Sequence, residues 1–87
     1  MPLIARLGDT STHGGAIITS AAKSLCEGAL IARRTDILDC PIHGPNPIVE
    51  HSEKMLCEGL EVARDGDATA CGARLISGAV ITKDEAN

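Results

Sequence analysis

The sequence predicts a small all-β domain, made of short strands and turns with an approximate threefold internal repeat. Apolar runs of three to five residues lie between turn signals, which is typical of strands rather than of helices of about ten or more residues. Nine glycines and four prolines in 87 residues indicate many turns. Three similar segments in so short a chain favour packing about one axis over a solenoid.

The repeat is visible directly in the sequence. Residues 23–40 and 54–71 are identical at nine of eighteen aligned positions, with an offset of 31. A shorter copy, residues 3–9, matches residues 30–36 at five of seven positions, with an offset of 27. At these offsets the three units end at equivalent residues, which are His13, Cys40 and Cys71.

Local patterns place strands within the repeats. The runs Ala29–Arg33 and Leu60–Arg64 each follow a Glu-Gly turn and are expected to be strands. A helical turn within residues 20–27 remains open. An apolar pair also follows each unit, four, eight and four residues after its end, so the middle unit has a four-residue insertion, and the inserted loop holds His43.

The composition limits the size of the core. An 87-residue chain is expected to form one domain, with a repeat domain over residues 1–80 and a short tail over residues 81–87. The chain has no Phe, Tyr or Trp, so its core depends on Ile, Leu, Val and Ala. Such a chain needs further stabilisation from a metal, disulfides or a partner.

Charge and hydropathy narrow the class of protein. The formal charge of −4 and the pI of about 5.2 argue against a nucleic-acid partner or an anionic membrane surface. No apolar run approaches about 18 residues, so an integral membrane protein is not expected. The N-terminal residues carry no signal-peptide pattern, and the protein is expected to start in the cytoplasm. There, its four cysteines are thiols or metal ligands rather than disulfides.

Histidines and cysteines in turn-rich segments indicate a zinc site. Cys40 and His43 form a Cys-x-x-His pair, His13 and Cys71 stand at equivalent repeat ends, and His51 also lies in a turn-rich segment. Zinc prefers four tetrahedral nitrogen and sulfur ligands, and neighbouring Gly or Pro lets the chain turn around the ion. A solvated loop residue is an equally good interpretation of any single histidine. For the whole set a structural zinc is favoured, because its binding free energy becomes folding free energy.

The other repeated residues have structural interpretations. Cys26 and Cys57 occupy equivalent Leu-Cys-Glu-Gly segments and are expected to be buried thiols. Arginine and aspartate recur three residues apart, either as a brace across a tight turn or as a solvated charged rim; the pairs are Arg6–Asp9, Arg33–Asp36 and Arg64–Asp67. A cysteine–histidine nucleophile is disfavoured, because the chain leaves room for only a minimal pocket. An enzyme is therefore not expected.

These motifs resemble the PAAR-repeat proteins of type VI secretion systems. The resemblance covers residues 3–80, and it is carried by Ala-Arg-Leu-Gly-Asp-Thr-Ser-Thr-His-Gly-Gly (5–15), Cys-Pro-Ile-His-Gly (40–44) and Ala-Arg-Asp-Gly-Asp-Ala-Thr-Ala-Cys-Gly (63–72). It implies a conical, monomeric β-fold that caps the VgrG spike trimer as its structural tip and sharpens it for membrane puncture. The resemblance also implies that the tip is secreted with the spike and that it serves as a carrier for effectors. The alternative is an adaptor that mainly recruits a separate toxin or its chaperone.

The resemblance also implies one structural zinc ion near the vertex, held by three histidines and one cysteine. That count selects His13, His43, His51 and Cys71, because the chain has three histidines. Repeat equivalence alone instead favours a set with Cys40 in place of His51. One departure from the family is Thr35, which replaces the usual turn glycine of the middle unit and leaves the geometry of that turn open.

Overall fold

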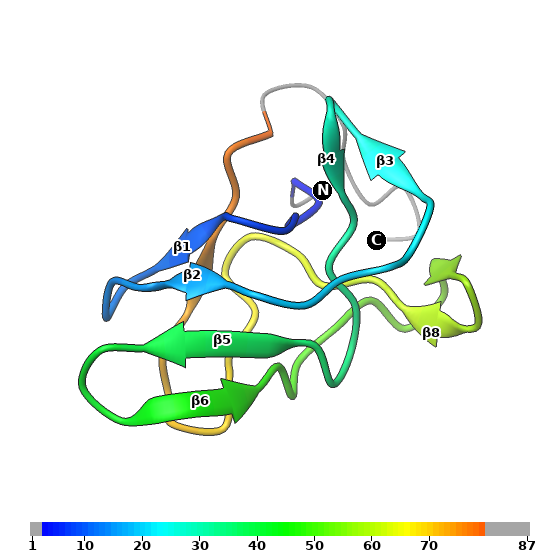
Figure 1. The fold of residues 1–87 in the computed structure, drawn as a ribbon. Coiled ribbons are helices and arrows are strands. Elements are labelled where there is room, and N and C mark those ends of the chain that lie inside the picture. The colour runs from blue at the N-terminus through cyan, green and yellow to red at the C-terminus, as the bar shows by residue number, and fades with distance from the viewer. Residues whose placement is uncertain (1–2, 80–87) are drawn as a thin grey trace.

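A computed structural model describes residues 3–79, which form nine short β-strands joined by turns (Figure 1). The strands are β1 (Thr10–Ser11), β2 (Ala16–Ile17), β3 (Leu25–Cys26), β4 (Ala29–Leu30), β5 (Ile37–Cys40), β6 (Gly44–Pro47), β7 (Leu56–Cys57), β8 (Leu60–Glu61) and β9 (Leu75–Ile76). The predicted all-β class is confirmed, and segment 20–27 contains β3 instead of a helical turn. Within residues 3–79 there is no helix long and apolar enough to span a membrane. The predicted tail and its boundary at residue 80 lie outside the described residues.

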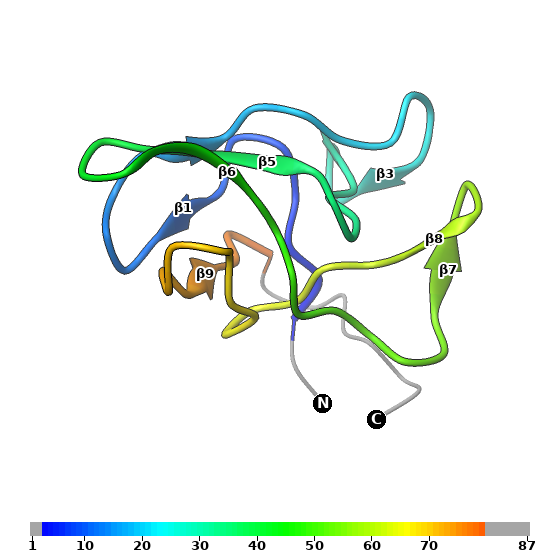
Figure 2. The same ribbon diagram turned by 90° about the horizontal axis from the view of Figure 1, so that it is seen from below.

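All of the strand pairs are antiparallel. β2, β5 and β6 form a three-stranded sheet, β1 pairs with β9, and β3–β4 and β7–β8 are two hairpins. The two hairpins lie at one end of the molecule, here called the hairpin end (Figure 2). The β1–β2 and β5–β6 turns lie at the other end, here called the turn end. The repeats are therefore arranged around one axis, with different elements at its two ends.

Three repeat-equivalent alanines form the centre of the fold. Ala5 donates its backbone N–H to Ala63, Ala63 donates to Ala32, and Ala32 donates to Ala5, each over 3.0 Å. All three residues are completely buried. A methyl side chain allows three backbones to approach this closely, whereas a larger one would overpack the site. This closed ring of hydrogen bonds confirms the expected pseudo-threefold packing.

The core lies in two clusters along the axis. Toward the turn end, three of the largest buried side chains come from equivalent positions after each repeat, and they pack with Leu38 of β5; the three are Ile17, Ile48 and Leu75. Toward the hairpin end, Cys26 and Cys57 pack with Ile4 and Val62. Both thiols are buried, at 4% and 7% exposure, as the sequence predicted. The chain has no Phe, Tyr or Trp, so each cluster depends on aliphatic side chains and cysteine.

The repeated arginine–aspartate pairs are braces. In each copy the aspartate accepts the backbone N–H of its arginine over 2.8–2.9 Å and the guanidinium Nε over 3.1–3.4 Å; the pairs are Arg6–Asp9, Arg33–Asp36 and Arg64–Asp67. Each aspartate N–H in turn donates to the arginine carbonyl over 3.0 Å. The aspartates are only 5–8% exposed. The solvated-rim interpretation is therefore wrong, because burial with complete hydrogen bonding makes each pair part of the turn itself.

Thr35 stands where the other two repeats have a turn glycine, and it adopts the same backbone geometry as those glycines. Its φ is +73°, compared with +89° at Gly8 and +87° at Gly66. This left-handed backbone costs an L-residue about 1–2 kcal/mol, and a β-branched side chain is among the least suited to it. The middle repeat therefore has the same turn as the other two repeats, and the backbone of Thr35 is strained in it.

We expect Thr35→Gly to stabilise the protein by about 1 kcal/mol, after the greater flexibility of glycine in the unfolded chain is subtracted. Urea unfolding measures this change. Gly66→Ala is the matched control, because no atom lies within 4 Å of the added Cβ and only the backbone penalty remains. That variant should lose about as much stability as Thr35→Gly gains. A Thr35→Gly protein that is less stable than the parent would contradict the assignment of strain.

Glu58 joins the β7–β8 turn to the segment that precedes β3. Its carboxylate accepts the backbone N–H groups of Ala22, Lys23 and Ser24 and the hydroxyl of Ser24, over 2.9–3.0 Å. The Ser24 hydroxyl, followed by the N–H groups of Lys23 and Ala22, lowers the pKa of Glu58 to about 2. The ionised carboxylate thus fixes one hairpin against the approach to the other.

We expect this contact to weaken in acid. Because the pKa of Glu58 is lower in the folded than in the unfolded chain, its stabilisation is complete above about pH 4.5 and is lost as the pH falls toward about 2. Glu58→Gln should therefore be less stable than the parent at pH 7, and the difference should shrink at pH 2–3. Urea midpoints across this range measure it, with the exposed Glu53→Gln as control. A difference that stays constant with pH would exclude this linkage.

Candidate metal centre

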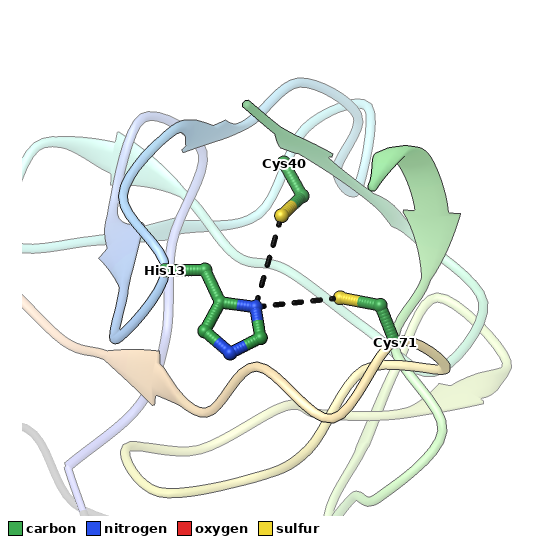
Figure 3. A group of neighbouring side chains, drawn as sticks. All are labelled: His13, Cys40 and Cys71. Carbon is green, nitrogen blue, oxygen red and sulfur yellow. Dashed lines mark hydrogen bonds between the residues drawn. The ribbon is translucent and has the colours of Figure 1, made fainter. Parts of the chain in front are cut away.

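Three segments, one from each repeat, converge at the turn end and carry the candidate ligands. His13 lies in the β1–β2 turn, Cys40 is the last residue of β5, and Cys71 lies in the turn before β9. Figure 3 shows the side chains of all three directed toward one point. The repeat ends that are equivalent in sequence are thus adjacent in space.

Local hydrogen bonds fix the position of His13. The buried hydroxyl of Ser11 donates to the Gly14 carbonyl over 2.8 Å and accepts the N–H of His13 over 3.2 Å. Gly14 donates its N–H to the Ser11 carbonyl over 2.9 Å, which closes the turn. Ser-x-His-Gly is therefore a preformed turn that directs the imidazole inward.

Hydrogen bonds also fix the position of Cys71 and of the turn that contains it. Its backbone N–H donates to the side-chain oxygen of Asn46 on β6 over 3.1 Å. Thr69 is buried, donates its N–H to the Ala73 carbonyl over 2.8 Å, and accepts the N–H of Gly72 over 3.0 Å. These bonds dock the turn on the β5–β6 sheet, which places the Cys71 sulfur beside that of Cys40.

The distances suit a tetrahedral zinc ion. The Nδ1 atom of His13 lies 3.8 Å from the Cys40 sulfur and 3.9 Å from the Cys71 sulfur (Figure 3). All three candidate ligand atoms lie within 4.8 Å of one another. A tetrahedral zinc separates neighbouring ligands by roughly 3.6 Å between nitrogen and sulfur and by roughly 3.8 Å between two sulfurs. The three side chains therefore have a spacing close to that of one face of a zinc tetrahedron.

The environment of Cys71 favours its thiolate. The Thr69 hydroxyl lies 3.3 Å from the sulfur. This contact is the largest cause that lowers the pKa of Cys71 to about 7, aided by the backbone N–H of Ala73 and by His13 and Cys40, and opposed by partial burial. Because zinc binds the thiolate and not the thiol, a cysteine that ionises near neutral pH is a suitable ligand.

His43 is next to this cluster. Its ring centroid lies 5.4 Å from that of His13, with the ring planes tilted by 47°. Two histidine rings bound to one tetrahedral zinc have centroids roughly 5 Å apart. His43 is exposed and follows β5 in the β5–β6 turn, so it lies beside the cluster of His13, Cys40 and Cys71 without being part of it.

His51 occupies a different part of the molecule. It lies in the segment between β6 and β7, which leads away from the β5–β6 turn toward the hairpin end (Figure 2). Its Nδ1 atom lies 2.8 Å from the carbonyl oxygen of Ser52. The pKa of Glu61 on β8 is lowered mainly by its hydrogen bond with Arg34, and the nearby His51 contributes to the same effect. Of the four residues selected by family count, the structure brings His13 and Cys71 together, with His43 beside them, and it places Cys40 rather than His51 in the cluster.

Sequence comparison identifies the family. The model of the PAAR motif family matches residues 7–77 of the 87-residue chain, which include the three clustered candidate ligands. A search of curated proteins gives no significant match. The PAAR motif is associated with the spike tips of type VI secretion systems, where it is a structural component rather than an enzyme. From the matched residues and the threefold fold, we conclude that the chain belongs to the PAAR motif family.

Proposed function

We propose that this protein is the tip of a type VI secretion spike, seated on the end of the VgrG trimer. The observation that carries the proposal is the closed ring of Ala5, Ala32 and Ala63, which gives one chain three equivalent faces. A monomer with threefold pseudosymmetry can make similar contacts with three identical subunits. One chain per trimer is the expected stoichiometry.

The hairpin end is the proposed base. It exposes Leu25 and Leu56, which occupy equivalent positions in the β3–β4 and β7–β8 hairpins and are 64% and 62% exposed. Exposed leucines at equivalent positions are suited to burial against a symmetric partner. The short strands at this end would also cover the strand edges of the trimer, which are otherwise prone to aggregation.

The turn end is the proposed vertex, held by a single structural zinc. We propose His13, Cys40, Cys71 and His43 as its ligands; the set with His51 in place of Cys40 is the competing assignment. A four-ligand centre leaves no open position for a reacting water, which agrees with a structural role. By linking turns from three repeats, it would make the vertex resist deformation as the spike advances through a membrane.

In this proposal the protein resides in the cytoplasm until the spike is fired and then leaves the cell with it. A secreted effector, or the chaperone of an effector, would attach to the sides of the tip. The alternative role, an adaptor that mainly recruits a separate toxin, uses the same base contact. Two results together would favour the adaptor. A toxin should co-purify with this chain and depend on it for secretion, and the spike should still assemble in a strain that lacks the chain.

Binding to a purified VgrG trimer tests the base. Size-exclusion chromatography at micromolar concentration should give a complex of one chain per trimer that survives moderate salt, since no strongly charged interface is expected. The double variant Leu25→Asp/Leu56→Asp should abolish the complex, because charged groups would be buried at the interface. Ile42→Asp is the matched control: this residue is 66% exposed but lies in the β5–β6 turn, at the opposite end. No complex with the parent, or equal loss with both variants, would contradict the proposed base.

A further inference from the structure

The candidate centre contains two thiols that converge from different repeats. Cys40 and Cys71 are 31 residues apart in sequence, yet both sulfurs face the Nδ1 atom of His13 (Figure 3). The two sulfurs lie within 4.8 Å of each other. Rotation of a side chain between staggered positions can close such a gap to the roughly 2.05 Å of a disulfide bond. The arrangement thus permits a covalent link as well as shared metal binding.

We propose that Cys40 and Cys71 are an oxidisable pair, and that a peroxide converts them to a disulfide that cannot hold the metal. This inference rests on the metal centre proposed above only for its second half, the loss of zinc. The formation of the disulfide depends on the two thiols alone. In the competing set with His51, the same oxidation would remove one zinc ligand, Cys71, instead of two.

The exposure of the thiols sets the order of the reaction. Cys71 is partly exposed, whereas Cys40 is 2% exposed and the other two cysteines are also buried. A peroxide therefore meets Cys71 first. Its thiolate attacks one peroxide oxygen, the O–O bond breaks, and the products are a sulfenic acid on Cys71 and hydroxide, which takes up a proton to become water.

Cys40 then resolves the sulfenic acid. Its sulfur attacks the Cys71 sulfur, the S–S bond forms, the S–O bond breaks, and the hydroxyl leaves with the Cys40 proton as a second water. Two thiols are oxidised by two electrons, and one peroxide is reduced to two waters. Neither sulfur then carries the negative charge that a zinc ligand requires, so two of the four proposed ligands are lost in one step.

This chemistry fits the two environments of a secreted tip. The cytoplasm keeps thiols reduced, whereas the space outside the cell does not. The same residues would thus hold zinc during assembly and would become a covalent link between the second and third repeats once oxidised. That link would tie the β5–β6 sheet to the turn before β9, as the proposed zinc would, but without a need for free zinc.

The test treats the full chain, stripped of metal by a chelator, with a small excess of hydrogen peroxide. Free thiols should fall from the four of the reduced chain to two, and peptide mapping should find Cys40 linked to Cys71. The variant Cys26→Ala/Cys57→Ala should give the same linked peptide. In Cys40→Ser, Cys71 should instead accumulate sulfenic or sulfinic acid, because its resolving partner is gone. For zinc-loaded protein, a colorimetric chelator should detect zinc release at the rate of disulfide formation.

Each outcome decides one part of the inference. A Cys26–Cys57 link, a mixture of pairings, cross-linked dimers or four persistent thiols would overturn the proposed pair. A Cys40–Cys71 link formed while zinc stays bound would overturn the proposed loss of metal. A chain that forms this link but never binds zinc would support the thiol pair and contradict the metal centre on which the proposed function draws. The failure of one proposal is thus distinguishable from the failure of the other.

Discussion

Cys40→Ser should remove zinc from the protein, whereas His51→Ala should retain about one ion per chain. Cys40 lies 3.8 Å from the His13 nitrogen inside the cluster, and His51 contacts Ser52 in a separate segment. Structural zinc contributes about 10–16 kcal/mol of binding free energy in small zinc peptides. Losing even a few kcal/mol of it should lower the Tm by more than about 10 °C, since each kcal/mol shifts the Tm of a domain this size by about 4–8 °C. Elemental analysis after dialysis and thermal melts provide the two measurements.

The other variants complete this test. His13→Ala, His43→Ala and Cys71→Ser should behave like Cys40→Ser, because each removes one proposed ligand. Cys26→Ala and Cys57→Ala are matched controls, since these thiols are buried in the other core cluster. They should keep zinc and lose about 1–2 kcal/mol, as is usual for small buried residues. If His51→Ala loses zinc while Cys40→Ser keeps it, the assignment reverts to three histidines and one cysteine.

The repeat alignment predicted the cluster of His13, Cys40 and Cys71, which the histidine count did not. The offsets of 27 and 31 put His13, Cys40 and Cys71 at equivalent ends, and a threefold fold must bring equivalent ends together. No such symmetry applies to His51, which stands eight residues beyond His43 and beyond the strand β6. Where the chain travels after the β5–β6 hairpin depends on tertiary packing, so sequence spacing could not place that residue.

Other features were beyond prediction because they depend on contacts between distant segments. The sequence shows that Glu58 follows a strand and precedes a glycine, which is a turn signal. It does not show that the carboxylate would reach the N–H groups of residues 22–24. At Thr35 the local signal was misleading instead of missing. A threonine disfavours a left-handed backbone, but the Arg33–Asp36 brace imposes one. The repeat thus fixes the backbone even where a single residue is unsuited to it.

Gly15→Ala should cause a second large loss of stability, because the β1–β2 turn that contains Gly15 packs against β5 beside the candidate metal centre. Its φ is +74°, and an added Cβ would lie 2.0 Å from the backbone oxygen of Asp39 and 3.0 Å from a ring carbon of Pro41. Asp39 is paired to Ala16 on β2 and to Pro45 on β6, so that oxygen cannot move without opening the central sheet. We expect Gly15→Ala to lose about 2–5 kcal/mol, from the overpacking and left-handed backbone penalties together.

Zinc affinity should fall in the same variant, because the β1–β2 turn that carries His13 would be displaced from the cysteines. Urea unfolding with zinc, and again with a chelator, separates the loss of packing from the loss of metal. Gly28→Ala is the matched control: its φ is +86° and no atom lies within 4 Å of the added Cβ, so only the backbone penalty of about 1 kcal/mol applies. That variant should keep its zinc, since the residue lies in the β3–β4 turn at the hairpin end. Equal destabilisation of the two variants would show that the close approach of the β1–β2 turn to β5 does not determine the geometry of the metal centre.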